Sequence, residues 1–179
     1  MIPFPHSSLI AALFAIGMLA AQSAGASSFP GGASSLVETY DDWGVVCQIQ
    51  NNAPACVIRQ VQTNNQTNQV VLTVEIGKAA DGKFQGVLLL PLGLALAQGA
   101  QLKIDDNSIG APLAFSTCVP QGCLVPLVLE ADTITKLRAG KALNVTVSAA
   151  NPAKPVTFAV SLKGFSGALN RVAELTKSS

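Results

Sequence analysis

The residues most able to do chemistry in this sequence are four cysteines, Cys47, Cys56, Cys118 and Cys123. Their spacings are C-x8-C and C-x4-C, so the C-x-x-C pairs of a zinc site or a dithiol oxidoreductase are missing. In an oxidising compartment an even set of cysteines is most simply a set of disulfides. Four cysteines allow three connectivities, and we favour Cys47–Cys56 together with Cys118–Cys123.

Histidine and paired carboxylates are the other sources of catalytic chemistry. The one histidine, His6, lies in an N-terminal segment that we expect to be removed, so no imidazole would serve a catalytic triad, a Cys-His dyad or a metal site. Glycoside hydrolysis needs only two acids, and Asp41-Asp42 and Asp105-Asp106 are candidate pairs. Neighbours on a strand point to opposite faces, so neither pair makes a two-acid site by itself. The run 105–108 is typical of a turn, with a calcium site as the weaker alternative. We therefore expect no enzyme, no catalytic residue, no metal and no cofactor.

The first 26 residues have the pattern of a cleaved signal peptide. The segment 9–21 is an apolar run of a length typical of a signal sequence, and it is followed by the small residues Ala24 and Ala26. We predict cleavage between Ala26 and Ser27, although residues 1–8 lack the usual Lys or Arg. An uncleaved anchor helix is the alternative. Cleavage places the mature chain in the periplasm, at the outer membrane or outside the cell, with no transmembrane segment left.

Composition and charge describe one folded domain. Hydrophobic residues make up 49% and charged residues 12% of the chain, which is too apolar for a disordered protein. The net charge is +1 with no basic run, so we expect no nucleic-acid partner. Residues 27–39 are rich in Gly and Ser and are interpreted as a flexible leader, and residues 40–179 as a single β domain.

Short β-rich segments separated by turn residues run through the rest of the chain. This pattern predicts an all-β fold, an antiparallel β-sandwich of about nine short strands with one or two short helices, held by disulfides. The expected strands are Trp43–Gln50, Ala55–Val61, Gln69–Ile76, Phe84–Leu90, Ala100–Ile104, Leu113–Thr117, Leu124–Leu129, Ala142–Ala149 and Val156–Leu162. The expected helices are Asp132–Ala139, followed by Gly140, and Ser166–Lys177, with Ser166 as a candidate cap; irregular edge structure is the alternative for both.

Strand geometry tests the first cysteine pair. If Asn51-Asn52 forms a two-residue hairpin turn, Cys47 faces Cys56 at a non-hydrogen-bonded site, where side chains approach most closely. Pro54 then also falls at a site that needs no N–H. The same register places Trp43 on an apolar face, so we expect it in the core rather than in a sugar-binding platform. A longer loop with a slipped register is the alternative. Cys118 and Cys123 flank a turn built on Pro120 and Gly122.

An ordered set of residues resembles one known family. The set runs from Trp43-x3-Cys47 and Cys56, through Leu90-Pro91-Leu92-Gly93 and Phe115-x2-Cys118-x3-Gly122-Cys123, to Ser161-Leu162-x-Gly164-Phe165. It is similar to the invasion-associated locus B family, small exported proteins of alpha-proteobacteria, over roughly residues 40–172. The resemblance implies a periplasmic or outer-membrane-associated β-sandwich without established catalytic residues. Founding members are linked to host-cell entry and virulence, but many members occur in bacteria that infect nothing.

Three functions are compared on these grounds. The first is an exported non-enzymatic envelope or secreted protein that binds an envelope or host protein, glycan or membrane component. The second is a small-molecule or polysaccharide-binding module of the periplasm, for which Trp43 and Phe115 are the aromatic candidates. The third is a histidine-free hydrolase, which needs two carboxylates about 5–10 Å apart in one cleft.

Overall fold

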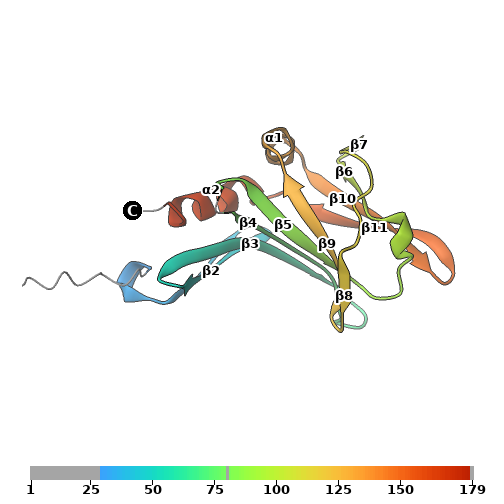
Figure 1. The fold of residues 1–179 in the computed structure, drawn as a ribbon, viewed down its shortest axis with the longest axis horizontal. Coiled ribbons are helices and arrows are strands. Elements are labelled where there is room, and N and C mark those ends of the chain that lie inside the picture. The colour runs from blue at the N-terminus through green and yellow to red at the C-terminus, as the bar shows by residue number, and fades with distance from the viewer. Residues whose placement is uncertain (1–28, 80, 178–179) are drawn as a thin grey trace, which may run out of the picture.

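The computed structural model describes residues 29–79 and 81–177, which form two antiparallel β-sheets and two α-helices (Figure 1). The larger sheet has seven strands in the order β1-β2-β3-β4-β5-β9-β8. These are β1 (Ser35–Tyr40), β2 (Trp43–Gln50), β3 (Ala53–Thr63), β4 (Val70–Lys78), β5 (Phe84–Leu90), β8 (Thr117–Val119) and β9 (Gly122–Leu129). The smaller sheet has four strands in the order β11-β10-β6-β7. These are β6 (Gln101–Ile104), β7 (Asn107–Ser108), β10 (Ala142–Ala150) and β11 (Ala153–Ser161). The predicted fold class is confirmed.

The helices connect the sheets and extend the core. Helix α1 (Ala131–Ala139) leads from β9 of the larger sheet to β10 of the smaller one. Helix α2 (Phe165–Leu175) follows β11 and packs on β1, β2 and β3, chiefly on the last two. The described residues also form two short 3₁₀ turns, η1 (Pro30–Gly32) and η2 (Leu96–Gln98). The smaller sheet and α2 together cover the inner face of the larger sheet.

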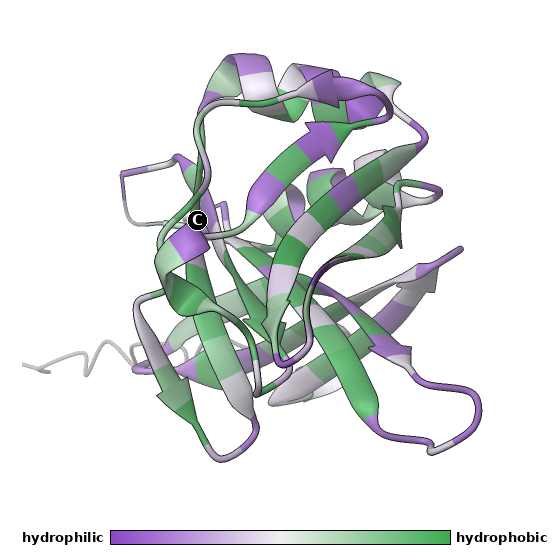
Figure 2. Cartoon of the chain, turned by 90° about the vertical axis from the view of Figure 1, so that its right-hand side faces the viewer, coloured by the Kyte–Doolittle hydropathy of each residue, from purple (hydrophilic) through white to green (hydrophobic). Residues whose placement is uncertain are grey.

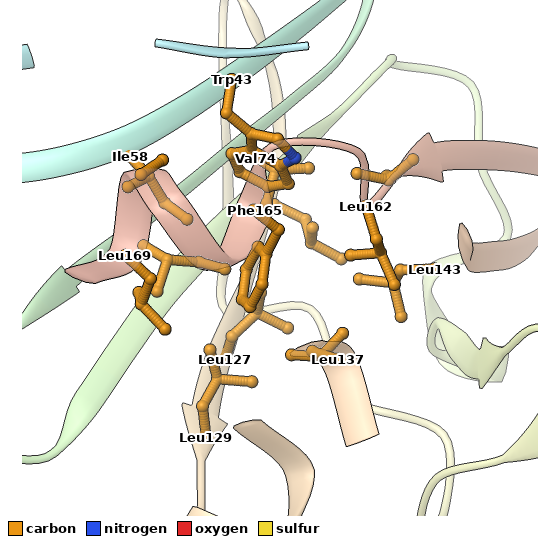
Figure 3. Packing of buried hydrophobic residues seen from close by; sticks show 14 of the residues in the cluster. Trp43, Ile58, Val74, Leu127, Leu129, Leu137, Leu143, Leu162, Phe165 and Leu169 are labelled. Carbon is orange, nitrogen blue, oxygen red and sulfur yellow. The ribbon is translucent and has the colours of Figure 1, made fainter. Parts of the chain in front are cut away.

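Trp43 lies at the centre of this core, as predicted (Figure 3). Its ring meets Phe165 of α2 edge to face, with the ring centroids 5.3 Å apart and the planes at 71°. Its indole Nε1 donates a hydrogen bond of 2.8 Å to the carbonyl of Ser161 on β11. One side chain of the larger sheet is therefore tied to both layers that cover it.

The hairpin of β2 and β3 has the predicted register. Asn51 and Asn52 form its turn with φ values of 49° and 63°, the left-handed region that a two-residue turn of this kind requires. Cys47 lies opposite Cys56, and Ile49 lies opposite Pro54. Hydrophobic and hydrophilic residues alternate along the strands (Figure 2), and in this hairpin the face that carries the cysteines is the buried one.

Both disulfides connect facing residues of a hairpin, in the pairing that we favoured. Cys47 joins Cys56 across β2 and β3, with a Cα–Cα distance of 4.1 Å. Cys118 joins Cys123 across β8 and β9, with a Cα–Cα distance of 4.0 Å. Both sulfurs of the first bridge belong to buried residues, whereas Cys118 is exposed at the outer edge of the larger sheet.

Two glutamines of β3 bind the free edge of β11. Gln60 donates from Nε2 to the Ser161 carbonyl at 3.0 Å and accepts from the Ser161 N–H at 3.2 Å. Gln62 donates from Nε2 to the carbonyl of Ala159 at 2.6 Å. These amides bind backbone groups at an edge that no strand of the described residues covers, and they join the two sheets.

The structure differs from the sequence-based expectation at the N-terminus. Residues 27–39 were expected to be a flexible leader, but Ser35–Tyr40 is strand β1 at the edge of the larger sheet. Its inner face carries a charge, Glu38, whose partner Arg171 lies on α2, so the hydrophobic alternation of a strand is broken. The predicted signal peptide (1–26) and its cleavage point at Ala26 and Ser27 lie outside the described residues.

The expected strand over 113–117 is also wrong. Residues 109–116 carry the chain from the smaller sheet to the larger one, and Leu113 makes only an isolated bridge with Ala100. The ladder begins at Thr117, where β8 pairs with β9. Each helix starts one residue earlier than expected, at Ala131 and Phe165. The N-cap residues are Glu130 and Gly164, so the candidate Ser166 does not cap its helix.

Candidate interaction surface

The acidic pair at 105–106 has a structural role. Asp105 lies in the turn between β6 and β7 with a φ of 51°, and its Oδ1 accepts hydrogen bonds from the backbone N–H groups of Lys141 and Ala142, both at 3.0 Å. Its own carbonyl accepts from Asn144 Nδ2 at 2.9 Å. These contacts bind the turn to the start of β10, so this carboxylate is committed to the backbone.

The acidic pair at 41–42 holds the turn of β1 and β2 against the loop before α2. Asp42 Oδ2 accepts a 2.6 Å hydrogen bond from the Ser161 hydroxyl, and Asp41 forms an ion pair with Lys163 at 3.2 Å. The two acidic pairs therefore lie in different turns, one between β6 and β7 and the other between β1 and β2. Within residues 29–79 and 81–177, no three His, Cys, Asp or Glu side chains gather as a metal site would require.

The two aromatic candidates for a sugar platform have separate environments. Trp43 is buried in the core, with 1% of its surface exposed. Phe115 is half-buried and lines a surface hollow of about 570 Å³, together with Leu96 of η2 and the exposed Cys118. The structure does not bring the two rings together, so the platform expected for the second function is not formed by this pair.

The outer face of the larger sheet carries a row of apolar residues. One transverse row of facing residues crosses six of its seven strands and is mostly apolar. From the β1 edge inward the row is Val37, Val46, Val57, Gly77, Gln85 and Val128. Val37 and Val128 at the two ends of this row are 71% and 72% exposed. An antiparallel sheet with one face in water normally carries polar residues there, so the outer face has an unusual composition.

A hollow lies in the middle of this row. It has a volume of about 470 Å³, and its floor is formed by Val46, Val57 and Gly77, where the glycine leaves out a side chain. The polar residues at its rim are Gln48, Gln50, Lys78 and Gln85. An apolar floor inside a rim of amides and one ammonium is the arrangement of many binding surfaces, in which the centre is desolvated and the rim stays wet. We call this the outer-face hollow.

Charges on the outer face are sparse. The neighbouring transverse row contains Arg59 and Glu75, which form an ion pair at 3.2 Å with side chains 47% and 37% exposed. Further along that row come Val87 and Pro126, so it becomes apolar as well. The surface offers contact area and amide hydrogen bonds, and it lacks the strong field that steers a charged ligand.

The sequence contained a signal for this surface that the strand-by-strand prediction did not use. Strands with one wet face alternate strictly, but β2 contains Val45-Val46 and β3 contains Val57-Ile58, where successive apolar residues must point to both faces. Such pairs at corresponding positions of neighbouring strands predict an apolar outer row. The alignment of these two pairs follows from the predicted register of the β2–β3 hairpin, but the extension of the row across β1, β4, β5 and β9 depends on registers that only the structure gives.

The chain resembles proteins of one family over most of its length. The model of the family described as "Invasion associated locus B (IalB) protein" matches residues 43–173. An invasion protein B homologue of Brucella abortus (strain 2308) is 53% identical over 164 residues, covering 92% of this chain and 94% of the relative. Invasion protein B of Bartonella bacilliformis is 36% identical over 152 residues, covering 84% of this chain and 81% of the relative.

A solved structure has the same fold. The crystal structure of invasion associated protein B from Bartonella henselae superimposes with a TM-score of 0.73 at 36% identity, covering 79% of this chain and 97% of that one. In the part of the chain that the structure describes, neither helix has the length and hydropathy needed to cross a bilayer. The family model, the relatives and the shared fold together show that this chain belongs to the invasion-associated locus B family.

Proposed function

We propose that this protein is exported and acts without catalysis, by binding a component of the bacterial envelope or of a host-cell surface through the outer-face hollow and the apolar row around it. The observation that carries the proposal is the composition of this sheet face, which is apolar, hollowed and rimmed by amides. Proteins seldom expose a contiguous apolar face without a partner for it.

Export is supported by the cysteines and by the N-terminal sequence. Both disulfides need an oxidising compartment to form and persist. Residues 1–26 have the signal-peptide pattern, with cleavage between Ala26 and Ser27. The proposed location is the periplasm, the outer membrane surface or the medium. N-terminal sequencing of protein from fractionated cells tests this: Ser27 as the first residue of an extracytoplasmic pool is expected, and a cytosolic pool starting at Met1 would contradict it.

The kind of partner is suggested by the relatives. Two proteins named for invasion, from Brucella and Bartonella, are 53% and 36% identical to this chain over most of its length. For this chain we accordingly propose a role in contact with host cells, and hence in virulence. If the source bacterium infects no host, the proposed partner is instead a protein or glycan of its own envelope.

The binding role is tested by saturable binding of the labelled mature chain, residues 27–179, to isolated envelopes and to host cells. A lysine in the floor of the hollow, Val57→Lys, places a charge where the surface must be desolvated, and we expect it to abolish saturable binding. Thr157→Lys adds the same charge at an exposed position of β11 on the smaller sheet, and it should bind as the wild type does. Circular dichroism and a melting curve must show both variants folded.

Two outcomes would contradict the binding role. One is an absence of saturable binding to either material, and the other is unchanged binding by Val57→Lys. Because the export test measures a different property, either part of the proposal can fail alone.

A further inference from the structure

Strand β1 has one edge of its backbone free. The turn Asp41-Asp42 pairs Tyr40 with Trp43, and Ile49 donates its N–H to the carbonyl of Ser34. Since hydrogen-bonding residues alternate along an antiparallel pair, the even-numbered residues 34–40 direct their N–H and C=O groups to β2. The backbone N–H and C=O groups of Ser35, Val37 and Thr39 point away from β2, and no strand of the described residues pairs with them.

The other sheet edges are short or protected. Edge strand β7 has two residues and β8 has three. Strand β8 covers β9 only over Gly122–Leu124, and in the uncovered half of β9 Pro126 lacks the N–H that would point outward. Strand β11 has nine, but Gln60 and Gln62 bind its carbonyls at Ser161 and Ala159, and Pro155 replaces a donor further along. Natural sheets limit edge-to-edge pairing by such short strands, prolines and covering groups. Among the described residues, β1 is a long edge that carries none of these devices.

The inward-facing charge of β1 does not block its edge. Inward-pointing charges can prevent pairing because a second strand would bury them, but Glu38 is already paired. Arg171 of α2 binds both oxygens of its carboxylate, from Nε at 2.9 Å and from Nη2 at 2.8 Å, and Tyr40 donates to it at 3.0 Å. This cluster holds β1 against α2, which lies mainly over β2 and β3 and leaves the edge open.

The free edge is complementary to itself. A twofold axis through Val37 places this residue opposite its own copy as a hydrogen-bonded pair, and it places Ser35 opposite Thr39 of the second copy in both directions. Only a residue on the axis faces its own copy, and Val37 is uncharged. Glu38, one residue away, would lie opposite Leu36 of the second copy, and its charge is already paired with Arg171. The facing hydroxyl residues are a favourable cross-strand pair. The valine side chains both lie on the outer face, so the two apolar rows become continuous.

We propose that two copies of this chain associate through antiparallel pairing of β1 with β1, centred on Val37, to form one continuous sheet of fourteen strands. Each copy contributes seven of these strands. The contact is one strand wide and about 20 Å long at ~3.4 Å per residue. It therefore buries much less area than the ~1,600 Å² of a standard interface. The dimer is therefore a reversible one, and it presents two outer-face hollows on the same side.

Sedimentation velocity of the mature chain over a concentration series measures this dimer. We expect a monomer–dimer equilibrium for the wild type. In Val37→Lys two ammonium groups meet at the axis, which raises the dissociation constant at least about tenfold. The matched control is Val128→Lys, because Val128 has the same outer face and the same exposure but lies five strands from β1, and its dissociation constant should stay within about twofold of wild type.

A cysteine at the axis tests the register. The native cysteines are all in disulfides, so Val37→Cys and Val128→Cys each add a single thiol. Mild oxidation should give a covalent dimer of Val37→Cys, since facing residues of such a pair lie within disulfide reach, and none of Val128→Cys. A chain that stays monomeric at every concentration would overturn the proposal and leave the edge to a strand of another protein. A dimer unaffected by Val37→Lys, or equally weakened by Val128→Lys, would overturn it by locating the contact elsewhere.

Discussion

At the residue scale, Glu38 accepts hydrogen bonds from two side chains, Arg171 and Tyr40. The Arg171 guanidinium holds the pKa of this carboxyl below its usual value of 4.5, chiefly by hydrogen bonding, and Tyr40 adds a further hydrogen bond. Burial, with the hydrogen bond to Glu38, raises the pKa of Tyr40. The side chains of Glu38 and Arg171 are both 27% exposed, so water screens the pair only in part. It links strand β1, at the start of the domain, to helix α2 at its end.

Replacing Glu38 by glutamine should lower the free energy of unfolding by about 1 kcal/mol at neutral pH, because a bidentate charge-assisted contact is lost. The sign of the pH dependence follows from the lowered pKa. The contribution of Glu38 is present above pH 4.5, the value of the unfolded chain, and is lost as the pH falls through the lower value of the folded state. Urea unfolding at several pH values should therefore show the wild type and Glu38→Gln converging in acid.

The control for this prediction is Glu75→Gln, which removes the more exposed pair with Arg59. An exposed single ion pair contributes about 0.5 kcal/mol or less. Equal losses from the two variants at neutral pH would show that the Glu38 cluster stabilises no more than an ordinary surface pair.

The two disulfides differ in burial and in ring size, and we predict unequal contributions to stability. Replacing Cys47 and Cys56 by alanine should lower the free energy of unfolding by about 3 kcal/mol or more, since a ring entropy of ~2.7 kcal/mol adds to the loss of buried sulfur. Replacing Cys118 and Cys123, which close a shorter ring with one exposed member, should cost about 2 kcal/mol. Urea unfolding followed by the fluorescence of the single, buried Trp43 measures both. The reverse order would contradict the prediction.

At the scale of elements, predictability follows the range of the contacts that define each one. The hairpin of β2 and β3 was predicted with its register, because a two-residue Asn turn, a proline and a cysteine pair are all local signals. Strand β1 was missed because its inner charge is neutralised by Arg171, 133 residues away. Residues 113–117 were taken for a strand because Leu113 and Phe115 are apolar, but these side chains pack against the core and the ladder begins only at Thr117.

The start of α2 depends on one close approach that the sequence does not show. Gly164 is the N-cap of this helix with a φ of 85°, and a Cβ there would overlap the carbonyl oxygen of Tyr40. We expect Gly164→Ala to lower the free energy of unfolding by about 3 kcal/mol or more, because backbone strain and steric overlap act together. Gly93 has the same φ of 85° with open space around it, so Gly93→Ala should cost only about 1 kcal/mol, the strain alone. Thermal unfolding compares them, and equal costs would rule out the overlap.

At the scale of the whole molecule, the fold could be predicted from the sequence but the candidate site could not. The sandwich follows from strand periodicity and turn residues, which each segment carries by itself. The outer-face hollow arises where Val46, Val57 and Gly77 meet side by side, and this depends on the registers of two successive hairpins. For the acidic pairs the sequence suggested a site that the structure does not form. Asp105 and Asp42 instead hydrogen-bond to neighbouring elements and hold them together.

A surface of this composition has a predictable response to salt. Salt screens exposed charges over a distance of ~10 Å at 0.1 M, but it does not weaken the burial of apolar area. Lys78 is the one charged residue among those that line the hollow. We therefore expect the affinity of the mature chain for its envelope or host partner to change less than about threefold between 0.05 and 0.5 M salt, because at most about one ion pair is screened. Saturation binding at each salt concentration measures this. A decline of several orders of magnitude would show that charges outside the hollow dominate the contact, and the outer face would then have to be abandoned as the binding surface.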